Sequence, residues 1–141
     1  MRKYIWLILV CWTPFLVRSQ TSTPIQLGFF KGVPKAFDGC AGSYTFDTTS
    51  LKKEKYIFVT NLQGLGMIRI QGKIISLHMV SQVSLPEKST KETYEGEGYS
   101  VVTILKDGKP TGDEGNYVSG TITIKSGKTT MTIKVHGTAG C

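Results

Sequence analysis

Two cysteines, one histidine and one aspartate are the side chains of this sequence that could most readily do chemistry together. Cys40 and Cys141 are the cysteines beyond the first 19 residues, with Asp38 close to the first and His136 close to the second. If the two sulfurs lie side by side, Asp38 and His136 are drawn toward the same end of the domain. A thiolate beside these two side chains could act as a nucleophile or share a metal ion with them.

A disulfide is the interpretation that we favour for the two cysteines. The first 19 residues predict export, and thiols of exported proteins seldom stay reduced. A Cys40–Cys141 bridge would close a loop of roughly 100 residues, for which the chain-entropy model gives about 4 to 5 kcal/mol of stabilisation. The sequence therefore predicts a structural bridge, with His136 partly solvated. The alternative is a small thiol- or metal-dependent enzyme that uses Cys40, Cys141, His136 and Asp38.

The other polar side chains lack the spacing of a catalytic or metal-binding motif. His78 has no partner at the spacing of a metal site or a catalytic triad, and the sequence contains no zinc-protease, hydrolase or phosphate-loop motif. Asp107, Asp113 and Glu114 lack the alternating oxygen ligands of a calcium loop, so we interpret this stretch as a polar turn. We assign no catalytic, cofactor-binding or metal-binding residue and expect no cofactor.

Residues 1–19 have the pattern of a secretory signal peptide. A basic start is followed by the apolar run 4–10, and small or permissive residues precede a cleavage site before Gln20. The apolar run is shorter than the roughly 20 residues of a membrane-spanning helix, and the charged Arg18 lies shortly after it. We expect export to the periplasm, the outer-membrane surface or the extracellular space, with no transmembrane segment after cleavage.

The charge of the chain gives little support for nucleic-acid binding. The formal net charge is +7, and residues 1–19 contain three basic residues and no acid, which leaves +4 for the remainder. That value is mild for a domain of this size, and basic residues are not concentrated in one long run. We therefore expect no nucleic-acid partner.

The hairpin near the C-terminus alternates apolar and polar residues, and the prediction of a β domain depends on this alternation. With a two-residue turn at Gly127–Lys128, Ile124 faces Met131 and Ile122 faces Ile133. The threonines and lysines between them share the opposite face, so one face is apolar and one polar. By the same logic we place a second hairpin turn at Gly72–Lys73.

Further strands are predicted from alternating or β-branched segments, and the fold class is inferred from them. The predicted strands are 43–46, 56–60, 79–85, 94–98, 99–105 and 116–125. We interpret 47–50 as a polar turn, 51–55 as a charged connector, and 86–93 and 106–115 as loops. No amphipathic helix is predicted beyond residue 19. Residues 20–36 are an extended lead-in, and residues 37–141 are a single all-β domain, an antiparallel seven- to eight-stranded small barrel or sandwich.

Several stretches resemble small uncharacterised exported bacterial proteins. They are Phe37–Tyr44, Lys55–Val59, Ile68–Lys73, Gly120–Lys125 and Val135–Cys141. The resemblance covers about residues 37–141 and implies export and a cysteine near each end of the domain, but no activity. In architecture alone the chain is also similar to periplasmic lysozyme-inhibitor barrels, and no functional residue is carried over from them.

These observations lead to an expected function without a known ligand. We expect a non-catalytic exported binding or inhibitory module of the bacterial cell envelope, whose partner is a protein or glycan of the envelope. One sheet face or the segments 86–93 and 106–115 would make the contact. A structural subunit that associates through an exposed strand edge at Tyr94–Gly98 is a further possibility.

Overall fold

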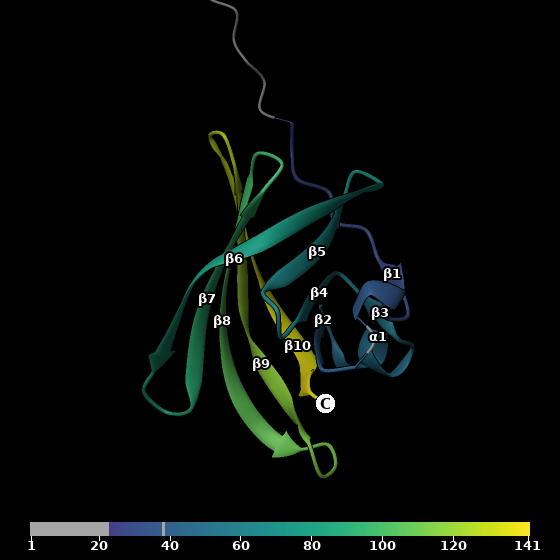
Figure 1. Cartoon of the computed structure of the whole chain (residues 1–141). Coiled ribbons are helices and arrows are strands. Elements are labelled where there is room, and N and C mark those ends of the chain that lie inside the picture. Colours follow the sequence, from purple (N-terminus) through teal and green to yellow (C-terminus); the bar gives the residue numbers. More distant parts are fainter. Residues whose placement is uncertain (1–22, 38) are drawn as a thin grey trace, which may run out of the picture.

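The computed structural model describes residues 23–37 and 39–141, and it is a closed antiparallel barrel of eight strands. The strands are arranged around the barrel in the order β10-β2-β4-β5-β6-β7-β8-β9, while β1 and β3 form a separate two-stranded sheet (Figure 1). The predicted all-β class is confirmed, and the architecture is a barrel, not a sandwich. The predicted signal peptide and Asp38 lie outside the described residues.

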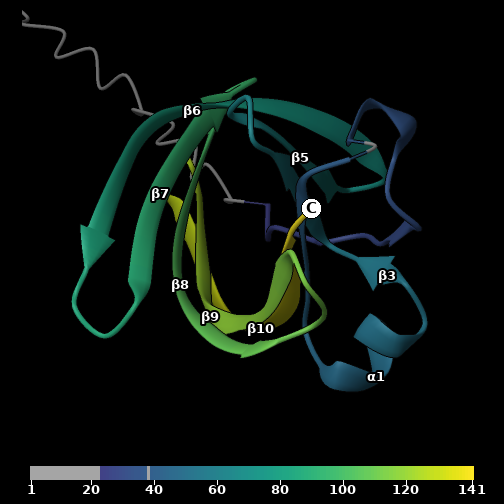
Figure 2. The same ribbon diagram turned by 60° about the horizontal axis from the view of Figure 1, so that its bottom comes forward.

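The helices and strands have bounds that differ in places from the predicted ones. They are β1 Phe30–Lys31, η1 Lys35–Phe37, β2 Ala41–Thr45, α1 Thr48–Lys52, β3 Lys55–Tyr56, β4 Phe58–Asn61, β5 Leu65–Ile70, β6 Lys73–Leu85, β7 Ser89–Gly96, β8 Tyr99–Pro110, β9 Gly115–Ser126 and β10 Thr129–Gly140. In Figure 2 the small sheet and α1 lie outside the barrel wall, beside the lower ends of β9 and β10.

The predicted register of the last hairpin is confirmed. Ile124 faces Met131 and Ile122 faces Ile133 across β9 and β10, as expected from a turn at Gly127–Lys128. Gly127 has a φ of 55°, which suits the first central position of a type II′ turn. Ile122 and Ile124 are fully buried, so the apolar face of this hairpin forms part of the barrel interior.

The predicted register of the β5–β6 hairpin is wrong, because the turn lies one residue earlier than expected. The turn is Gln71–Gly72, which brings Ile70 opposite Lys73 and Ile68 opposite Ile75. Both turn residues have positive φ, 50° and 79°, and this combination matches the twist of a tight hairpin. Ile70 needs no apolar partner on β6, because the lead-in covers it.

Residues 25–28 of the lead-in run along β5 and pack their apolar side chains against the barrel core. Leu27 forms an isolated antiparallel bridge with Ile70, and the Gln71 amide donates to the Gln26 carbonyl at 2.8 Å. Ile25 belongs to the same buried cluster as Ile70. Side chains distant in sequence therefore complete the core at this end of the barrel.

Four further segments differ from their sequence-based predictions. Residues 47–55 contain a short helix, α1, instead of only a turn and a connector. The predicted strand 56–60 is divided by a bend at Ile57, whose amide donates to the Tyr44 carbonyl at 2.8 Å. Most of 86–93 and 106–110 is strand: residues 89–93 pair with β6 and β8, and β8 continues through 106–110 alongside β9.

The predicted exposed edge at Tyr94–Gly98 is not present. β7 pairs with β6 on one side and with β8 on the other, so that Tyr94 lies between Met79 and Val101. A closed barrel leaves no free ladder of backbone groups in its wall. Association through that edge is therefore excluded for the folded barrel.

The barrel interior centres on three aromatic rings, one pair stacked and the other edge-to-face. Phe58 lies between Tyr44 and Tyr94, with ring centroids 5.8 and 5.3 Å apart. A smaller apolar cluster lies on the outer side of the wall, where Phe30, Phe37 and Tyr56 cover Val59 of β4. This outer cluster holds the segment around α1 and β3 against the barrel.

Candidate binding groove beside the disulfide

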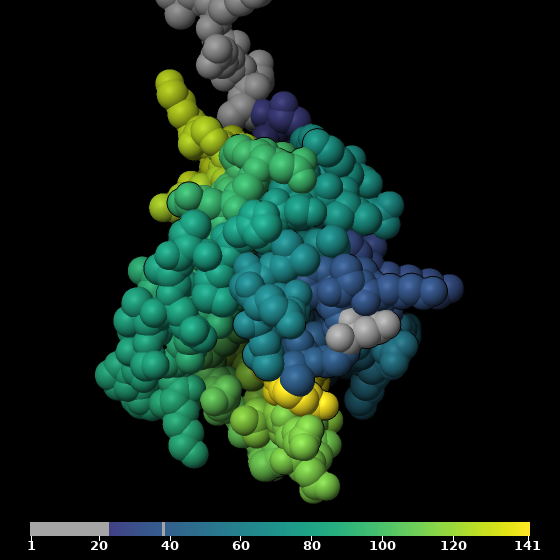
Figure 3. Space-filling view, viewed as in Figure 1, coloured from purple at the N-terminus to yellow at the C-terminus, as the bar shows by residue number. Residues whose placement is uncertain are grey.

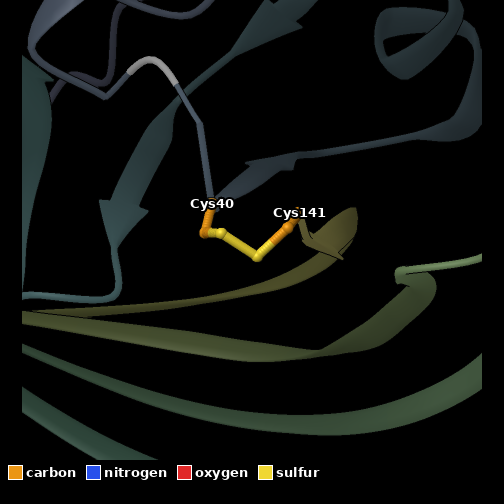
Figure 4. Close-up of a disulfide and its surroundings, with 2 residues drawn as sticks. All are labelled: Cys40 and Cys141. Atoms are coloured by element: carbon orange, nitrogen blue, oxygen red, sulfur yellow. A yellow bond between two sulfur atoms is a disulfide. The ribbon is translucent and has the colours of Figure 1, made fainter.

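The predicted disulfide between Cys40 and Cys141 is confirmed (Figure 4). Cys40 directly precedes β2, and Cys141 directly follows β10. The last paired residues of these two strands, Ala41 and Gly140, are partners in the register. The bridge therefore fastens the seam at which the first and last strands of the barrel meet.

The chemistry of a thiol site is not available to the bonded sulfurs. Neither Cys40 nor Cys141 carries the thiolate that a nucleophile or a metal ligand must supply. His136 lies five residues before Cys141 on β10, which at about 3.3 Å per residue is roughly 16 Å along the strand. Within residues 23–37 and 39–141, no three His, Cys, Asp or Glu side chains are grouped so as to hold a metal ion.

The remaining polar residues considered from sequence are dispersed. His78 is exposed on β6, where it pairs with Leu65 and Glu95. Asp107 belongs to β8, whereas Asp113 and Glu114 lie in the turn that joins β8 to β9. The structure thus confirms a polar turn only for residues 111–114, and it separates Asp107 from the other two carboxylates.

A groove lies on the outer surface of the barrel, between α1 and the lower ends of β9 and β10. Its volume is about 790 Å³. The floor comes from outward-facing residues of β9 and β10, including Tyr117, Ser119 and His136, and the opposite wall comes from α1 and β3. The lining residues are Thr48, Leu51, Lys52, Glu54, Tyr56, Gly108, Tyr117, Val118, Ser119, His136, Gly137 and Thr138.

A second hollow of about 350 Å³ continues from this groove toward the disulfide. Tyr56 and Thr138 line both hollows, and Cys141 lies at the far end. The β8–β9 turn, with Asp113 and Glu114, forms one side. In Figure 3 the C-terminus lies between the blue region of β2–β4 and the green β8–β9 turn. We call the two hollows together the outer groove.

Local sequence explains why α1 stands beside the barrel as a wall of the outer groove. Asp47 caps the helix: its Oδ1 accepts the Ser50 amide at 2.7 Å, and its Oδ2 accepts the Ser50 hydroxyl at 3.1 Å. The bond from the Ser50 amide is the main reason that the pKa of Asp47 is lowered. Leu51 packs against the outer apolar cluster and anchors the helix.

The groove has a mostly apolar surface, to which two tyrosines contribute, and a few polar groups. Hydroxyl groups come from Thr48, Ser119 and Thr138, and an imidazole comes from His136. Burial, followed by the negative charge of Glu54, raises the pKa of Tyr56, so its phenol stays protonated and can donate a hydrogen bond. Tyr117 is 51% exposed and presents much of its ring to solvent.

Part of this groove was predicted from the sequence. A sheet face and the segment 106–115 were expected to make the contact, and Gly108 and residues 111–115 do line the outer groove. The opposite wall was missed, because residues 47–55 were interpreted as turn and connector. The aspartate at position 47 ahead of Thr48 to Ser50 is a helix N-cap pattern, and it was the available signal.

No protein-family model, no curated protein and no solved structure matches this chain. The resemblance to exported bacterial proteins therefore receives no support from a relative. In the part of the chain that the structure describes, no helix has the length and apolar character needed to cross a bilayer.

Proposed function

We propose that this protein is a non-catalytic exported binding or inhibitory module of the bacterial cell envelope, and that its ligand lies in the outer groove. The observation that carries the proposal is the groove itself, which continues from α1 to the disulfide over an exposed sheet face. The Cys40–Cys141 bridge is consistent with an oxidising compartment. Periplasm, outer-membrane surface and extracellular space are all compatible with it.

A glycan is the ligand class that the lining of the groove favours over a protein segment. Sugars present hydroxyl groups around an apolar ring face, and binding sites for small or chain-like ligands combine aromatic surface with a few directed polar groups. Tyr117 offers the ring face, and Ser119, His136 and Thr138 offer donors and acceptors. Beside α1, Lys52 and Glu54 carry opposite charges, so this part of the groove favours a largely uncharged chain. Asp113 and Glu114 line only the hollow toward the disulfide.

The test is binding of purified cell-wall glycan fragments, measured by isothermal titration calorimetry. Tyr117→Ala is expected to weaken binding at least tenfold, which corresponds to about 1.4 kcal/mol, whereas Tyr117→Phe retains the ring and most of the affinity. His136→Ala is expected to weaken binding as well. His78→Ala is the matched control, because His78 is exposed on β6 and does not line the groove.

Two outcomes would contradict this proposal. One is the absence of glycan binding by a correctly folded, disulfide-bonded protein. The other is an equal effect of His78→Ala and His136→Ala, because that would place the ligand elsewhere. Binding of an envelope protein in place of a glycan, with the same dependence on Tyr117, would keep the groove as the site but reject the glycan.

A further inference from the structure

We propose a second site, inside the lower end of the barrel, that binds a small primary ammonium ion. It lies on the inner side of β2 and β10, whereas the outer groove lies on their outer side. Its volume is about 180 Å³. We call it the barrel-end chamber, and its lining residues are Ala41, Gly42, Tyr44, Thr60, Asn61, Leu62, Met79, Gln82, Glu92, Tyr94, Ala139 and Gly140.

A half-buried carboxylate without a cationic partner is the feature that selects the ligand. The Oε2 atom of Glu92 accepts a hydrogen bond from the Tyr94 hydroxyl at 2.8 Å, and its Oε1 accepts one from the Gln82 amide at 3.1 Å. Both donors are neutral. The ion pairs found in residues 23–37 and 39–141 join Lys73 to Glu97 and Lys106 to Glu87, and neither involves Glu92.

Glu92 is held in position by hydrogen bonds from neutral groups, and no basic side chain lies in the chamber with it. The lining of the chamber contains no lysine, arginine or histidine. Glu92 is partly withdrawn from water, so a cation that approaches it closely interacts with it more strongly than with a fully exposed carboxylate. The chamber therefore favours a positively charged ligand over a neutral or anionic one of the same size.

Two hydroxyl groups converge on the same space and favour a donor with several hydrogens. Gly42 lies so close to the Tyr44 and Thr60 hydroxyls that an added Cβ would collide with both. With the Glu92 carboxylate they supply three oxygen acceptors, and a primary ammonium carries three N–H donors. A quaternary ammonium of similar size has none, so it could approach the carboxylate but could not donate hydrogen bonds to these oxygens.

Thr103 gives independent evidence that this section of the barrel contains unsatisfied polar atoms. It faces Glu92 across the β7–β8 ladder, and its side chain is fully buried. Its hydroxyl has no hydrogen-bond partner within the described part of the chain. Buried hydroxyls are normally paired, so Thr103 is an exception next to Glu92, although it does not itself line the chamber.

The volume limits the size of the ligand. A water molecule occupies about 30 Å³ in the liquid, so 180 Å³ holds a molecule of only a few heavy atoms. A free small amine fits this limit. We therefore use ethylammonium as the probe, with ethanol as the neutral analogue of similar size and tetramethylammonium as the cation without N–H donors.

The experiment is titration of the purified, disulfide-bonded protein with each probe, monitored by calorimetry and by backbone NMR shifts. Ethylammonium is expected to bind and to shift the amide signals of Glu92 and Thr103. Ethanol and tetramethylammonium are expected to bind at least tenfold more weakly. Glu92→Gln keeps the shape of the side chain and is expected to lose at least tenfold in affinity for ethylammonium. Glu95→Gln, at an exposed carboxylate on the same strand, is the matched control.

The proposal is overturned if ethylammonium does not bind, if ethanol binds equally well, or if Glu92→Gln leaves the affinity unchanged. The NMR spectrum of Glu92→Gln shows directly whether the variant is folded. If it is not, Gln82→Ala is used instead, which removes one donor to Glu92 and is expected to change the affinity while Glu95→Gln does not. Tyr117→Ala is expected to leave ethylammonium binding unchanged, so failure of the chamber and failure of the outer groove can be told apart.

Discussion

At the scale of single residues, glycines on the inner face of the barrel make room for its large aromatic side chains. An added Cβ at Gly66 would press on the rings of Phe58 and Tyr94, and one at Gly137 would press on the ring of Tyr44 and on the Ser43 carbonyl. These glycines have no positive φ, so their role is close approach and not backbone freedom.

Because two tyrosines are buried, the free energy of unfolding is expected to decrease at alkaline pH. Burial is the largest cause that raises the pKa of Tyr44 to about 12, and it raises the pKa of Tyr94 as well, with the Glu92 charge as the next cause. In the unfolded chain a tyrosine ionises near its ordinary value of 10.0. Between pH 10 and the folded-state pKa, the unfolded chain loses the tyrosine proton while the folded protein keeps it. The contribution to the free energy of unfolding is therefore fully present below pH 10 and is lost as the pH rises toward the folded-state pKa.

We expect the free energy of unfolding to fall steeply above pH 10. The Tyr44 shift from 10.0 to about 12 alone corresponds to roughly 3 kcal/mol, since one pKa unit is about 1.4 kcal/mol. Urea unfolding at a series of alkaline pH values measures this loss. Tyr44→Phe removes the ionisable group and is expected to flatten the pH dependence. A slope that is the same in the variant would show that Tyr44 does not contribute to it.

At the scale of the elements, two hairpins with the same Gly-Lys dipeptide use it differently. In the β9–β10 hairpin, Gly127 and Lys128 are the two turn residues, whereas in the β5–β6 hairpin the turn is Gln71–Gly72 and Lys73 already belongs to β6. Both arrangements preserve the alternation of buried and exposed residues. The choice between them depends on contacts with the lead-in, which a local pattern does not contain.

We expect Gly72→Ala to destabilise the protein by about 1 to 2 kcal/mol. Gly72 has a φ of 79°, a conformation in which a Cβ atom crowds the backbone. The space around its Cβ position is open, so the effect is one of backbone conformation and not of packing. Chemical denaturation measures it. Lys128→Ala changes a turn residue without positive φ, and a loss as large as that of Gly72→Ala would contradict this explanation.

The predicted strands agree best with the structure where one face is buried. Ile122, Ile124 and Val135 alternate with polar residues, and the register of their hairpin is set by that alternation. Residues 89–93 and 106–110 contain no large apolar side chain, so the same criterion indicated loops. The wall at α1 was missed for a related reason: the helix has no buried residue to create a periodic signal.

At the scale of the whole molecule, the disulfide and the β10–β2 ladder together close the barrel. Five residue pairs connect these strands, from His136 with Thr45 to Gly140 with Ala41. The bridge then joins residues 101 positions apart in the sequence. Closing a loop of this size lowers the entropy of the unfolded chain more than a local link would, although the effect grows only with the logarithm of the loop length.

We expect Cys141→Ser to lower the free energy of unfolding by about 4 to 5 kcal/mol while leaving the secondary structure unchanged. The strands remain paired through backbone hydrogen bonds, so circular dichroism should be the same and the melting temperature much lower. The double variant Cys40→Ser/Cys141→Ser is the control and should resemble the single one. A melting temperature equal to that of the unchanged protein would show that the bridge does not restrict the unfolded chain.

Alternation of apolar and polar residues was sufficient to determine the all-β class, the antiparallel pairing and the register of the last hairpin, because each depends on neighbours along one or two strands. The two cysteines likewise sufficed for the disulfide. Closure into a barrel, the turn at Gln71–Gly72, the outer groove and the chamber around Glu92 were decided only in three dimensions. Each of them requires residues from distant segments to meet, and a linear pattern carries no information on which distant surfaces will pack together.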